Sequence, residues 1–286
     1  MVGLRHSFKV FIQNTLPINN KIEVNMHINL EGQTALVTGS TAGIGLAIAH
    51  SLYQAGASVI LNGRSKERLE KALTTFSDFN RLSTISADVG IAEECERIFA
   101  KYPEINILVN NAGIFSPRPI FDLDDNEWLN YFNINVMSGI RLSRFYVPKM
   151  MKKGWGRVIF ISSESALQIP TEMPHYGLTK TAQVAAARGF AQAASGTGVT
   201  VNSILPGPTQ SEGIERFVRE LIPDPTLSIE KAGKCFIETA RPASLLGRLA
   251  TSEEIANTVL FLASKQASAI TGTALRADGG VIQSIF

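Results

Sequence analysis

The sequence predicts an α/β fold: one doubly wound, parallel β-sheet of about seven strands with helices on both faces. From Glu31 onward, short apolar runs of strand length alternate with segments of helical period. Several of these runs are almost continuously apolar, as is typical of strands buried on both faces of a parallel sheet. Because repeated strand–helix–strand units build right-handed crossovers within one sheet, and because no linker or internal repeat divides the chain, we expect a single domain.

Apolar and β-branched runs predict strands at Thr34–Thr38, Ser58–Asn62, Leu82–Ser86, Ile105–Asn110, Arg157–Ser162, Val199–Ile204 and Thr273–Arg276. The spacing of apolar residues predicts helices between them, at Ile44–Gln54, Ser65–Phe76, Ala92–Ala100, Asp124–Lys152, Tyr176–Ala194 and Thr251–Ala263. The last helix begins with a capping box, Thr251 and Glu254. The alternation is interrupted between Pro206 and Arg248. We expect residues 208–248, called the lid segment below, to form a substrate lid or a disordered loop.

Composition excludes several classes of function. The 286 residues are 45 % hydrophobic, which is ample for a core, and 27 basic against 25 acidic residues leave a formal net charge of +2. This balance gives no electrostatic case for nucleic acid or a membrane surface as a partner. Cys95 and Cys235 show neither disulfide nor metal-ligand spacing, and no apolar run is as long as a membrane span. We therefore expect a cytoplasmic protein without a bound metal.

Residues 1–25 differ from the rest of the chain, and we expect them to be a poorly ordered extension of a domain at 26–286. Their apolar patch is short and interrupted by Lys9, and they lack the cleavage site of a secretory signal. A second methionine, Met26, lies just ahead of the first strand. Our hypothesis is an upstream extension or a misplaced start codon.

The first strand passes through a glycine-rich turn into the first helix. The glycines of this turn are Gly39, Gly43 and Gly45. Residues without a Cβ let backbone N–H groups approach a phosphate, and the positive N-terminal end of the helix points to the same place. The turn therefore favours a pyrophosphate ligand, with a purely steric need for glycine as the alternative.

Polar residues follow the next strands. Gly63 and Arg64 stand where a dinucleotide-binding fold places its ribose-reading residue; the missing acidic group and the planar cation favour NADP over NAD. Arg64 as a solvated residue at the start of a helix is the alternative. Asp88, followed by Val89, is suited to accept a hydrogen bond from an adenine amino group, or to cap the helix near Ile91.

Two further motifs follow the fourth and fifth strands. Asn110-Asn111-Ala112-Gly113 is a small polar turn able to pass close to a ribose, although such a turn needs no ligand to justify it. Ser163 ends the fifth strand, and Tyr176 and Lys180 are four residues apart, so they share one face of a helix. An ammonium near a phenol favours the phenolate and lowers its pKa, which makes a usable acid–base. A structural role for the Tyr–Lys pair is the alternative.

In combination, these motifs resemble the short-chain dehydrogenase/reductase family, from about Leu30 to Ser284. The matching residues are Thr38 to Gly45, Asn110 to Gly113, Asn135, Ser163, Tyr176, Lys180, Pro206 and Gly207. The resemblance implies a Rossmann-like fold and hydride transfer between a nicotinamide and a carbonyl or alcohol carbon. By the same resemblance Tyr176 is the general acid/base, Ser163 holds the substrate oxygen, Lys180 binds the nicotinamide ribose while tuning Tyr176, and Asn135 supports a water-linked proton relay to Lys180.

The cofactor contacts so predicted are Gly39, Ser40, Thr41, Gly43, Ile44, Gly45, Arg64, Asp88, Val89, Asn111, Ala112, Gly113, Tyr176, Lys180, Pro206, Gly207, Thr209 and Ser211. Two positions depart from the family pattern. Ala42 stands where many NADP-dependent relatives are basic, which keeps NAD(H) open as a cofactor. Glu164, directly after Ser163, brings a charge near the pocket unless it turns away.

We therefore expect an NADP(H)-preferring carbonyl reductase acting on a small molecule, and the family implies a homo-tetramer or dimer. The Asn62–Arg64 and Leu246–Leu249 segments are similar to those of 3-oxoacyl-acyl-carrier-protein reductases, which makes an acyl-carrier-bound substrate one hypothesis. A non-catalytic NADP-binding regulator and an NAD-retaining epimerase or dehydratase are the alternative functions.

Overall fold

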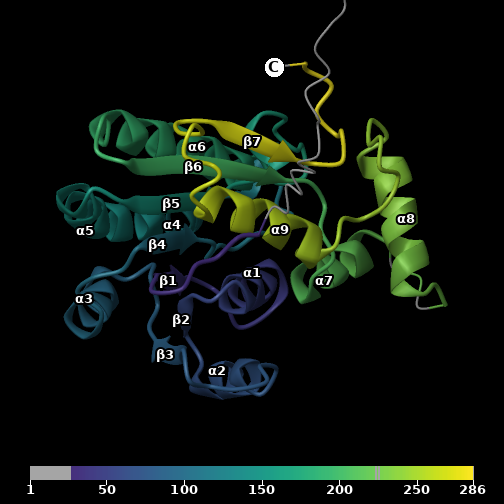
Figure 1. Cartoon of the computed structure of the whole chain (residues 1–286). Coiled ribbons are helices and arrows are strands. Elements are labelled where there is room, and N and C mark those ends of the chain that lie inside the picture. The colour runs from purple at the N-terminus through teal and green to yellow at the C-terminus, as the bar shows by residue number, and fades with distance from the viewer. Residues whose placement is uncertain (1–26, 223, 225, 286) are drawn as a thin grey trace, which may run out of the picture.

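The structure is a computed structural model that describes residues 27–222, 224 and 226–285, and it is built on one parallel sheet (Figure 1). The strands lie in the order β3-β2-β1-β4-β5-β6-β7, and all neighbouring pairs are parallel. Their bounds are β1 (Thr34–Val37), β2 (Ser58–Gly63), β3 (Leu82–Ser86), β4 (Ile107–Asn110), β5 (Gly156–Ile161), β6 (Val199–Pro206) and β7 (Ala274–Ala277). The predicted doubly wound α/β fold is confirmed. The expectations for residues 1–25 lie outside the described residues.

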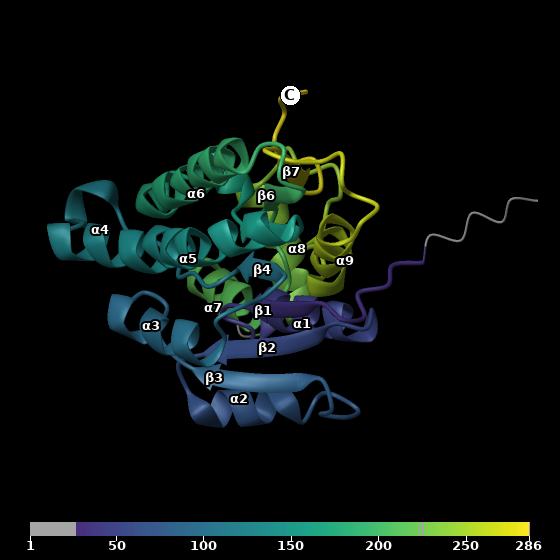
Figure 2. The ribbon, with the colours of Figure 1, turned by 60° about the vertical axis from the view of Figure 1, so that its left-hand side comes forward.

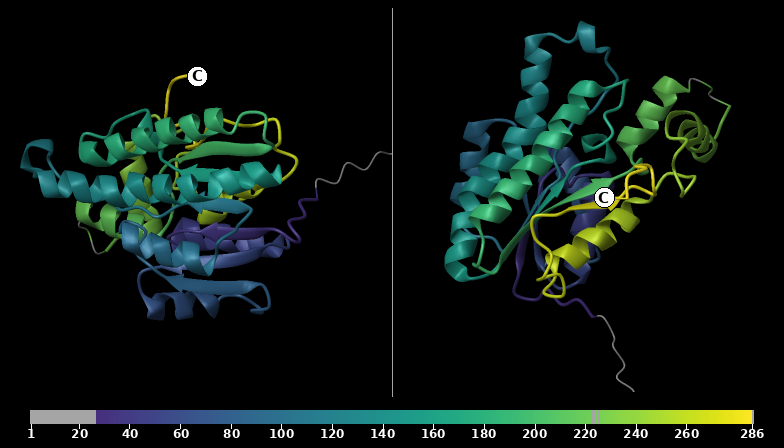
Figure 3. Two further views of the ribbon diagram at one scale, coloured as in Figure 1. Left: turned by 90° about the vertical axis from the view of Figure 1, so that its left-hand side faces the viewer. Right: turned by 90° about the horizontal axis from the view of Figure 1, so that it is seen from above.

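Helices cover both faces of the sheet (Figures 2 and 3). One face packs against α1 (Gly43–Gln54), α2 (Lys66–Leu73) and α9 (Ser252–Ala263), whose apolar side chains form a single cluster with the strands. The other face packs against α3 (Ala92–Lys101), α5 (Ser138–Lys153) and α6 (Pro174–Ala193) in a second cluster. Strands β4 and β5 are buried along their whole length, which explains why their sequences are largely apolar.

The strand order places a crevice at the carboxyl ends of β1 and β4. The chain runs outward from β1 to β3, returns to β4 on the other side of β1, and then runs outward again to β7. Loops after β1 and β4 therefore leave the sheet in opposite directions and open a space between them, where ligands bind in open parallel sheets. The predicted capping box of α9 is present: Thr251 Oγ1 accepts from the Glu254 N–H at 3.2 Å, and Glu254 Oε2 accepts from the Thr251 N–H at 2.8 Å.

The predicted helix over Asp124–Lys152 is wrong in its middle. It consists of α4 (Asp125–Phe132), a π-helical turn η2 (Asn133–Met137) and α5. The side-chain amide of Asn135 bonds out of the helix to the backbone of Ile114, and the Asn135 carbonyl oxygen accepts from a side chain of α6. These outside partners replace part of the helical ladder, and such π-turns are frequent at functional sites.

The lid segment is not a disordered loop. It contains α7 (Glu212–Leu221) and α8 (Ile229–Ala240), capped at their N-termini by Ser211 and Ser228. Phe217 on α7 packs edge-on against Phe236 on α8, with ring centroids 5.6 Å apart. The two helices therefore share an apolar cluster of their own, beside the carboxyl ends of the strands (Figure 1).

Two short 3-10 turns complete the secondary structure that bears on the site, η1 (Ile120–Asp122) and η3 (Glu164–Ala166). In the part of the chain that the structure describes, no helix is both long and apolar enough to span a bilayer.

Candidate active site

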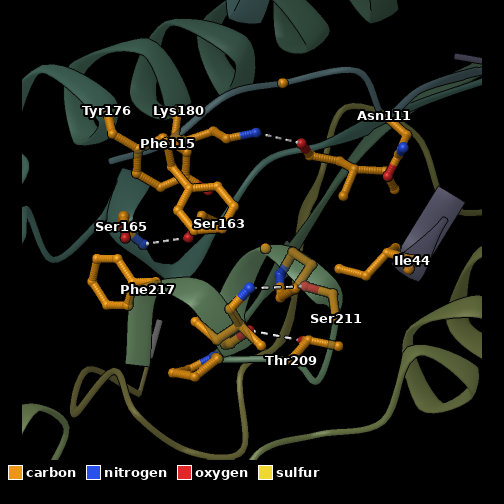
Figure 4. A pocket seen from close by; sticks show the side chains of 18 of the residues that line it. Ile44, Asn111, Phe115, Ser163, Ser165, Tyr176, Lys180, Thr209, Ser211 and Phe217 are labelled. Carbon is orange, nitrogen blue, oxygen red and sulfur yellow. Dashed lines mark hydrogen bonds between the residues drawn. The ribbon is translucent and has the colours of Figure 1, made fainter. Parts of the chain in front are cut away.

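A cavity of about 310 Å³, called the main cavity below, lies where the carboxyl ends of the central strands meet the lid segment. Figure 4 shows Tyr176, Lys180 and Ser163 together on one side of it, and Ile44, Thr209 and Ser211 on another. It is lined by the predicted residues Gly43, Ile44, Gly45, Asn111, Gly113, Ser163, Tyr176, Lys180, Pro206, Gly207, Thr209 and Ser211. Segments far apart in sequence therefore converge on one space.

The glycine turn closes one end of the main cavity, and its geometry requires glycine. A Cβ on Gly45 would lie 2.4 Å from the Gly39 carbonyl oxygen and 2.5 Å from Asn111 Nδ2, and Gly39 and Gly43 have φ of 62° and 53°. Asn111 Nδ2 donates to the carbonyl oxygens of Thr38, at 2.9 Å, and Gly39, at 3.1 Å. Asn111 thus braces the turn from the next loop.

The first turn of α1 is free to bind an anion. Its N-cap residue, Ala42, makes no side-chain cap hydrogen bond, and no acidic residue lies in the first turn. The N–H groups of a helix start and its positive dipole end therefore face the main cavity without a side-chain partner. The tight glycine turn and this helix end fit the pyrophosphate of a dinucleotide.

A second cavity of about 240 Å³, the adenosine-side cavity, lies beyond the glycine turn. It is lined by the predicted residues Gly39, Thr41, Arg64, Asp88, Val89, Ala112 and Gly113. The exposed Arg64 guanidinium lies 3.6 Å from an Asp88 carboxylate oxygen, while the other Asp88 oxygen accepts from the Gly90 N–H at 2.9 Å. The N-cap of α3 is Ile91, so Asp88 caps the preceding turn rather than the helix itself.

A second arginine, Arg68, lines both cavities and was missed by the sequence reasoning. Arg68 Nη2 lies 2.8 Å from Glu212 Oε2, and this ion pair joins α2 to the start of α7. With Arg64 it places two guanidinium groups around the adenosine-side cavity, four residues apart at the start of one helix.

Ser163, Tyr176 and Lys180 converge at the other end of the main cavity. Lys180 Nζ lies 5.3 Å from the centroid of the Tyr176 ring, as their four-residue spacing on α6 predicts. Ser163 is the N-cap of η3, and its Oγ accepts from the Ser165 N–H at 3.1 Å. The neighbouring Ser163 hydroxyl lowers the pKa of Tyr176.

The two titrating groups of α6 are shifted in opposite directions by burial. Desolvation raises the pKa of Tyr176, with a further increase from the Glu164 charge, and these effects outweigh the lowering by Ser163. Desolvation also lowers the pKa of Lys180 to about 7, against an opposing effect of Glu164. The sequence predicted a lowered pKa for Tyr176; in this structure desolvation by burial raises it instead.

Glu164 does not turn away from the pocket. It lines the main cavity, it accepts a short hydrogen bond from the Ser163 hydroxyl, and its Oε1 accepts from Arg241 Nε at 3.0 Å. Arg241 Nη2 also donates to Glu172 Oε1 at 3.0 Å. The side chains of Arg241 and Glu164 are only 8 % and 7 % exposed, so a buried ion pair stands beside the catalytic serine candidate.

Ser40 and Asn135 are not among the residues that line either cavity. Ser40 is fully buried; its hydroxyl donates to the Val37 carbonyl oxygen at 2.8 Å and accepts from the Asn62 N–H at 3.0 Å, which ties β1 to β2. Asn135 lies behind the cavity, where its amide nitrogen donates to Thr179 Oγ1 at 3.0 Å. Both support residues that do line the cavities.

One wall of the main cavity is apolar. Tyr176 faces Phe115, whose ring centroid lies 5.9 Å away, and Phe115 in turn contacts Phe217 at 6.0 Å. Met173 and Phe236 complete this wall. No local motif marks these residues, because they come from three separate segments that meet only in the folded chain.

Comparisons with known proteins show the family of this chain. Residues 39–282 match the family model described as enoyl-(acyl carrier protein) reductase. The chain belongs to the short-chain dehydrogenase/reductase family and is an oxidoreductase of that type.

Among its relatives, the uncharacterized oxidoreductase YvaG of Bacillus subtilis is 47 % identical over 91 % of this chain and 100 % of its own. The 3-oxoacyl-[acyl-carrier-protein] reductase FabG of Escherichia coli is 35 % identical over 89 % of this chain and 99 % of its own. Among solved structures, L-sorbose reductase from Gluconobacter frateurii, complexed with NADPH and L-sorbose, has a TM-score of 0.84 at 30 % identity, covering 91 % of this chain and 100 % of that one.

Proposed function

We propose that this protein is an NADP(H)-dependent oxidoreductase that interconverts a carbonyl and an alcohol, with Tyr176 as general acid/base. The observation that carries the proposal is that Ser163, Tyr176 and Lys180 line one cavity together with the glycine turn at its other end. A dinucleotide whose pyrophosphate lies at Gly45 can reach the residues of α6 through this space. When bound, the cofactor supplies or accepts the hydride.

The chain's own residues handle the proton and the substrate oxygen. In the direction of reduction, Tyr176 donates its phenolic proton to the carbonyl oxygen as negative charge develops there. The hydroxyl of Tyr176 stabilises that charge, and the Ser163 hydroxyl, which donates to Glu164 in the structure, adds a second donor when it turns to the substrate oxygen. The ammonium of Lys180, 5.3 Å from the ring centroid, favours the phenolate that remains.

Support for NADP(H) over NAD(H) comes from the adenosine-side cavity. Arg64 and Arg68 both line it, and planar guanidinium groups suit a 2′-phosphate. Asp88, the carboxylate in this lining, is 3.6 Å from Arg64 and is therefore partly neutralised. The similarity to L-sorbose reductase, whose structure is complexed with NADPH, points the same way.

For the substrate, we propose a small hydroxylated ketone. One wall of the main cavity is apolar, whereas the wall beside Ser163 carries Glu164 and Arg241. Arg241 has five N–H donors, of which three bond to Glu164, Glu172 and the Ala240 carbonyl oxygen. Among the described residues no partner bonds to the other two, and we propose that they bind substrate hydroxyls where Arg241 lines the main cavity. L-sorbose, which is bound in the structural relative, is a ketone with several hydroxyls. A long acyl chain has no hydroxyls to accept hydrogen bonds from Arg241.

The direct test is steady-state oxidation of NADPH with L-sorbose, a simple ketone and an acetoacetyl thioester. We expect turnover with the hydroxylated ketone, and Tyr176→Phe should reduce kcat by at least about 10³-fold while the Kd for NADPH changes little, because the acid is lost and the cofactor contacts stay. Substantial activity of Tyr176→Phe contradicts the assignment of the acid. Binding of NADPH without turnover on any substrate supports a regulator instead.

The cofactor preference is tested with Arg64→Ala, Arg68→Ala and the double variant. Each change should raise the KM for NADPH by roughly 10-fold and leave the KM for NADH unchanged, since only NADPH carries the 2′-phosphate. An equal effect on both cofactors would show that the arginines serve α2 rather than the phosphate.

We further propose a cytoplasmic homo-oligomer. Free Cys95 and Cys235 support a reducing compartment. Exposed apolar side chains on and near α4, among them Phe121, Leu129 and Phe132, support burial against a second copy. Light scattering of the purified chain decides the oligomeric state.

A further inference from the structure

The side-chain amide of Gln183 is buried between two parts of the candidate active site. It is only 1 % exposed. Its Oε1 accepts from Lys180 Nζ at 3.1 Å, and its Nε2 donates to the backbone carbonyl oxygen of Asn135 at 2.5 Å. Tyr176, Lys180 and Gln183 are spaced by four and then three residues on α6, so all three lie on the same face of that helix.

The orientation of this amide is determined by its two partners. An ammonium can only donate and a backbone carbonyl can only accept. Rotating the amide by half a turn would place its NH₂ group against the Lys180 ammonium and its oxygen against the Asn135 carbonyl oxygen, which makes two repulsive contacts in place of two hydrogen bonds. Gln183 therefore links Lys180 to the π-helical turn in only one orientation of its amide.

The same contacts aim the Lys180 side chain. Of the three N–H groups of its ammonium, one donates to the Ile161 carbonyl oxygen at 2.9 Å and one to Gln183 Oε1. The remaining N–H is left for the main cavity, which Lys180 lines. The Gln183 amide and the Ile161 carbonyl at the end of β5 thus bind two N–H groups of the ammonium, and the third N–H is directed to the main cavity.

We propose that Gln183 is a positioning residue of this site: it holds the Lys180 ammonium in its charged, cavity-facing state and ties it to the carbonyl of Asn135. The proposal rests on the function proposed above for Tyr176 and Lys180. It replaces the water-linked connection that the family resemblance implies between Asn135 and Lys180 by a side chain of the protein. An amide does not readily pass a proton from one of its ends to the other, so the role of Gln183 is orientation and charge stabilisation.

Because a hydrogen bond to a charged form favours that form, removing the Gln183 carbonyl lowers the pKa of Lys180. The other titratable groups that face this ammonium are Tyr176, on its own helix, and Glu164, after β5. A less charged Lys180 makes the Tyr176 phenolate harder to form, so the pH at which alcohol oxidation becomes fast moves upward.

The first test measures Lys180 itself and needs no turnover. The protein is labelled with [ε-¹³C]lysine, the Lys180 signal is identified by its loss in Lys180→Arg, and its pKa is read from the pH titration of the carbon shift. We expect a midpoint near 7 in the native chain. Gln183→Met should lower it by about one pH unit, whereas Gln183→Glu, which places a carboxylate at the same distance, should raise it.

The second test is kinetic, with Gln192→Met as the matched control because Gln192 is an exposed glutamine of the same helix. Gln183→Met should reduce kcat at neutral pH by about 10-fold, leave the KM for the alcohol largely unchanged and move the midpoint of the pH profile up by about one unit. Gln192→Met should behave as the native chain.

An unchanged Lys180 midpoint in both Gln183→Met and Gln183→Glu overturns the proposal. If Gln183→Met does not fold, the upward shift in Gln183→Glu alone decides it. If the native chain turns over no substrate, the proposed function fails, but the Lys180 midpoints still decide the role of Gln183. The two failures are therefore distinguishable.

Discussion

Replacing Arg241 by methionine would leave Glu164 as a buried carboxylate without its cation. The two side chains are only 8 % and 7 % exposed and lie 3.0 Å apart, so bulk water solvates the Glu164 carboxylate poorly once the guanidinium is gone. Glu172, the second partner of Arg241, is 24 % exposed and loses less, because it is partly solvated. The main cost of the substitution therefore falls on Glu164.

Removing one partner of a buried ion pair costs about 3–5 kcal/mol, because an uncompensated charge remains in the interior. In a large domain each kcal/mol changes the melting temperature by about 2 °C, so Arg241→Met should melt roughly 6–10 °C below the native chain. Methionine keeps most of the volume, so little of this loss comes from a cavity.

The assay is thermal unfolding followed by circular dichroism, with Arg248→Met as the matched control. Arg248 pairs with Glu254 at 2.8 Å, but both side chains are about half exposed, so this variant should lose less than about 1 kcal/mol. The double variant Glu164→Gln with Arg241→Met should recover at least half of the loss, since it removes the unpaired charge. A loss for Arg241→Met no larger than that of Arg248→Met would refute the reasoning.

Two further predictions concern Lys180 and Gly45. Burial lowers the pKa of Lys180 to about 7 from 10.5. Below pH 7 both the folded and the unfolded chain carry the proton, so the folded chain is destabilised by the full cost of the buried charge. Between about pH 7 and pH 10 the folded chain loses the proton first, and this destabilisation declines. Lys180→Met should therefore be more stable than the native chain by about 2–4 kcal/mol at pH 6, with a difference that shrinks toward pH 10; a difference that grows with pH contradicts this. Gly45→Ala brings a Cβ to 2.4 Å from the Gly39 carbonyl oxygen and should weaken NADPH binding at least about 10-fold, measured by fluorescence titration. The control is Gly189→Ala, whose Cβ has no atom within 4 Å. It should bind NADPH normally and gain about 0.5–1 kcal/mol of stability.

Much of the fold could be predicted from the sequence because the relevant signals are local. Apolar runs such as Ile107–Asn110 are typical of strands buried on both faces, and the capping box at Thr251 fixes the start of α9 within one residue. The π-helical turn could not be predicted, because Asn133–Met137 continues the apolar helical period without a break. Its cause lies in partners 21 and 48 residues away in sequence, Ile114 and Gln183.

The two helices of the lid segment could not be predicted from the sequence either. Its prolines indicate irregular structure, yet α7 and α8 form because each has a serine N-cap and an apolar face that the other helix covers. Neither face has a partner until the two helices meet. Local signals therefore underestimated the order of this segment.

What the sequence by itself determined is the doubly wound sheet, the glycine turn at Gly39 to Gly45 and the pairing of Tyr176 with Lys180, because each depends on residues within one turn or one period of the chain. What only the tertiary structure decided is the environment of these groups. Glu164 meets Arg241 across 77 residues and Gln183 meets Asn135 across 48. Burial, charge and hydrogen-bond partners at a site are properties of the space that folding encloses, and no local pattern encodes which distant side chains will share it.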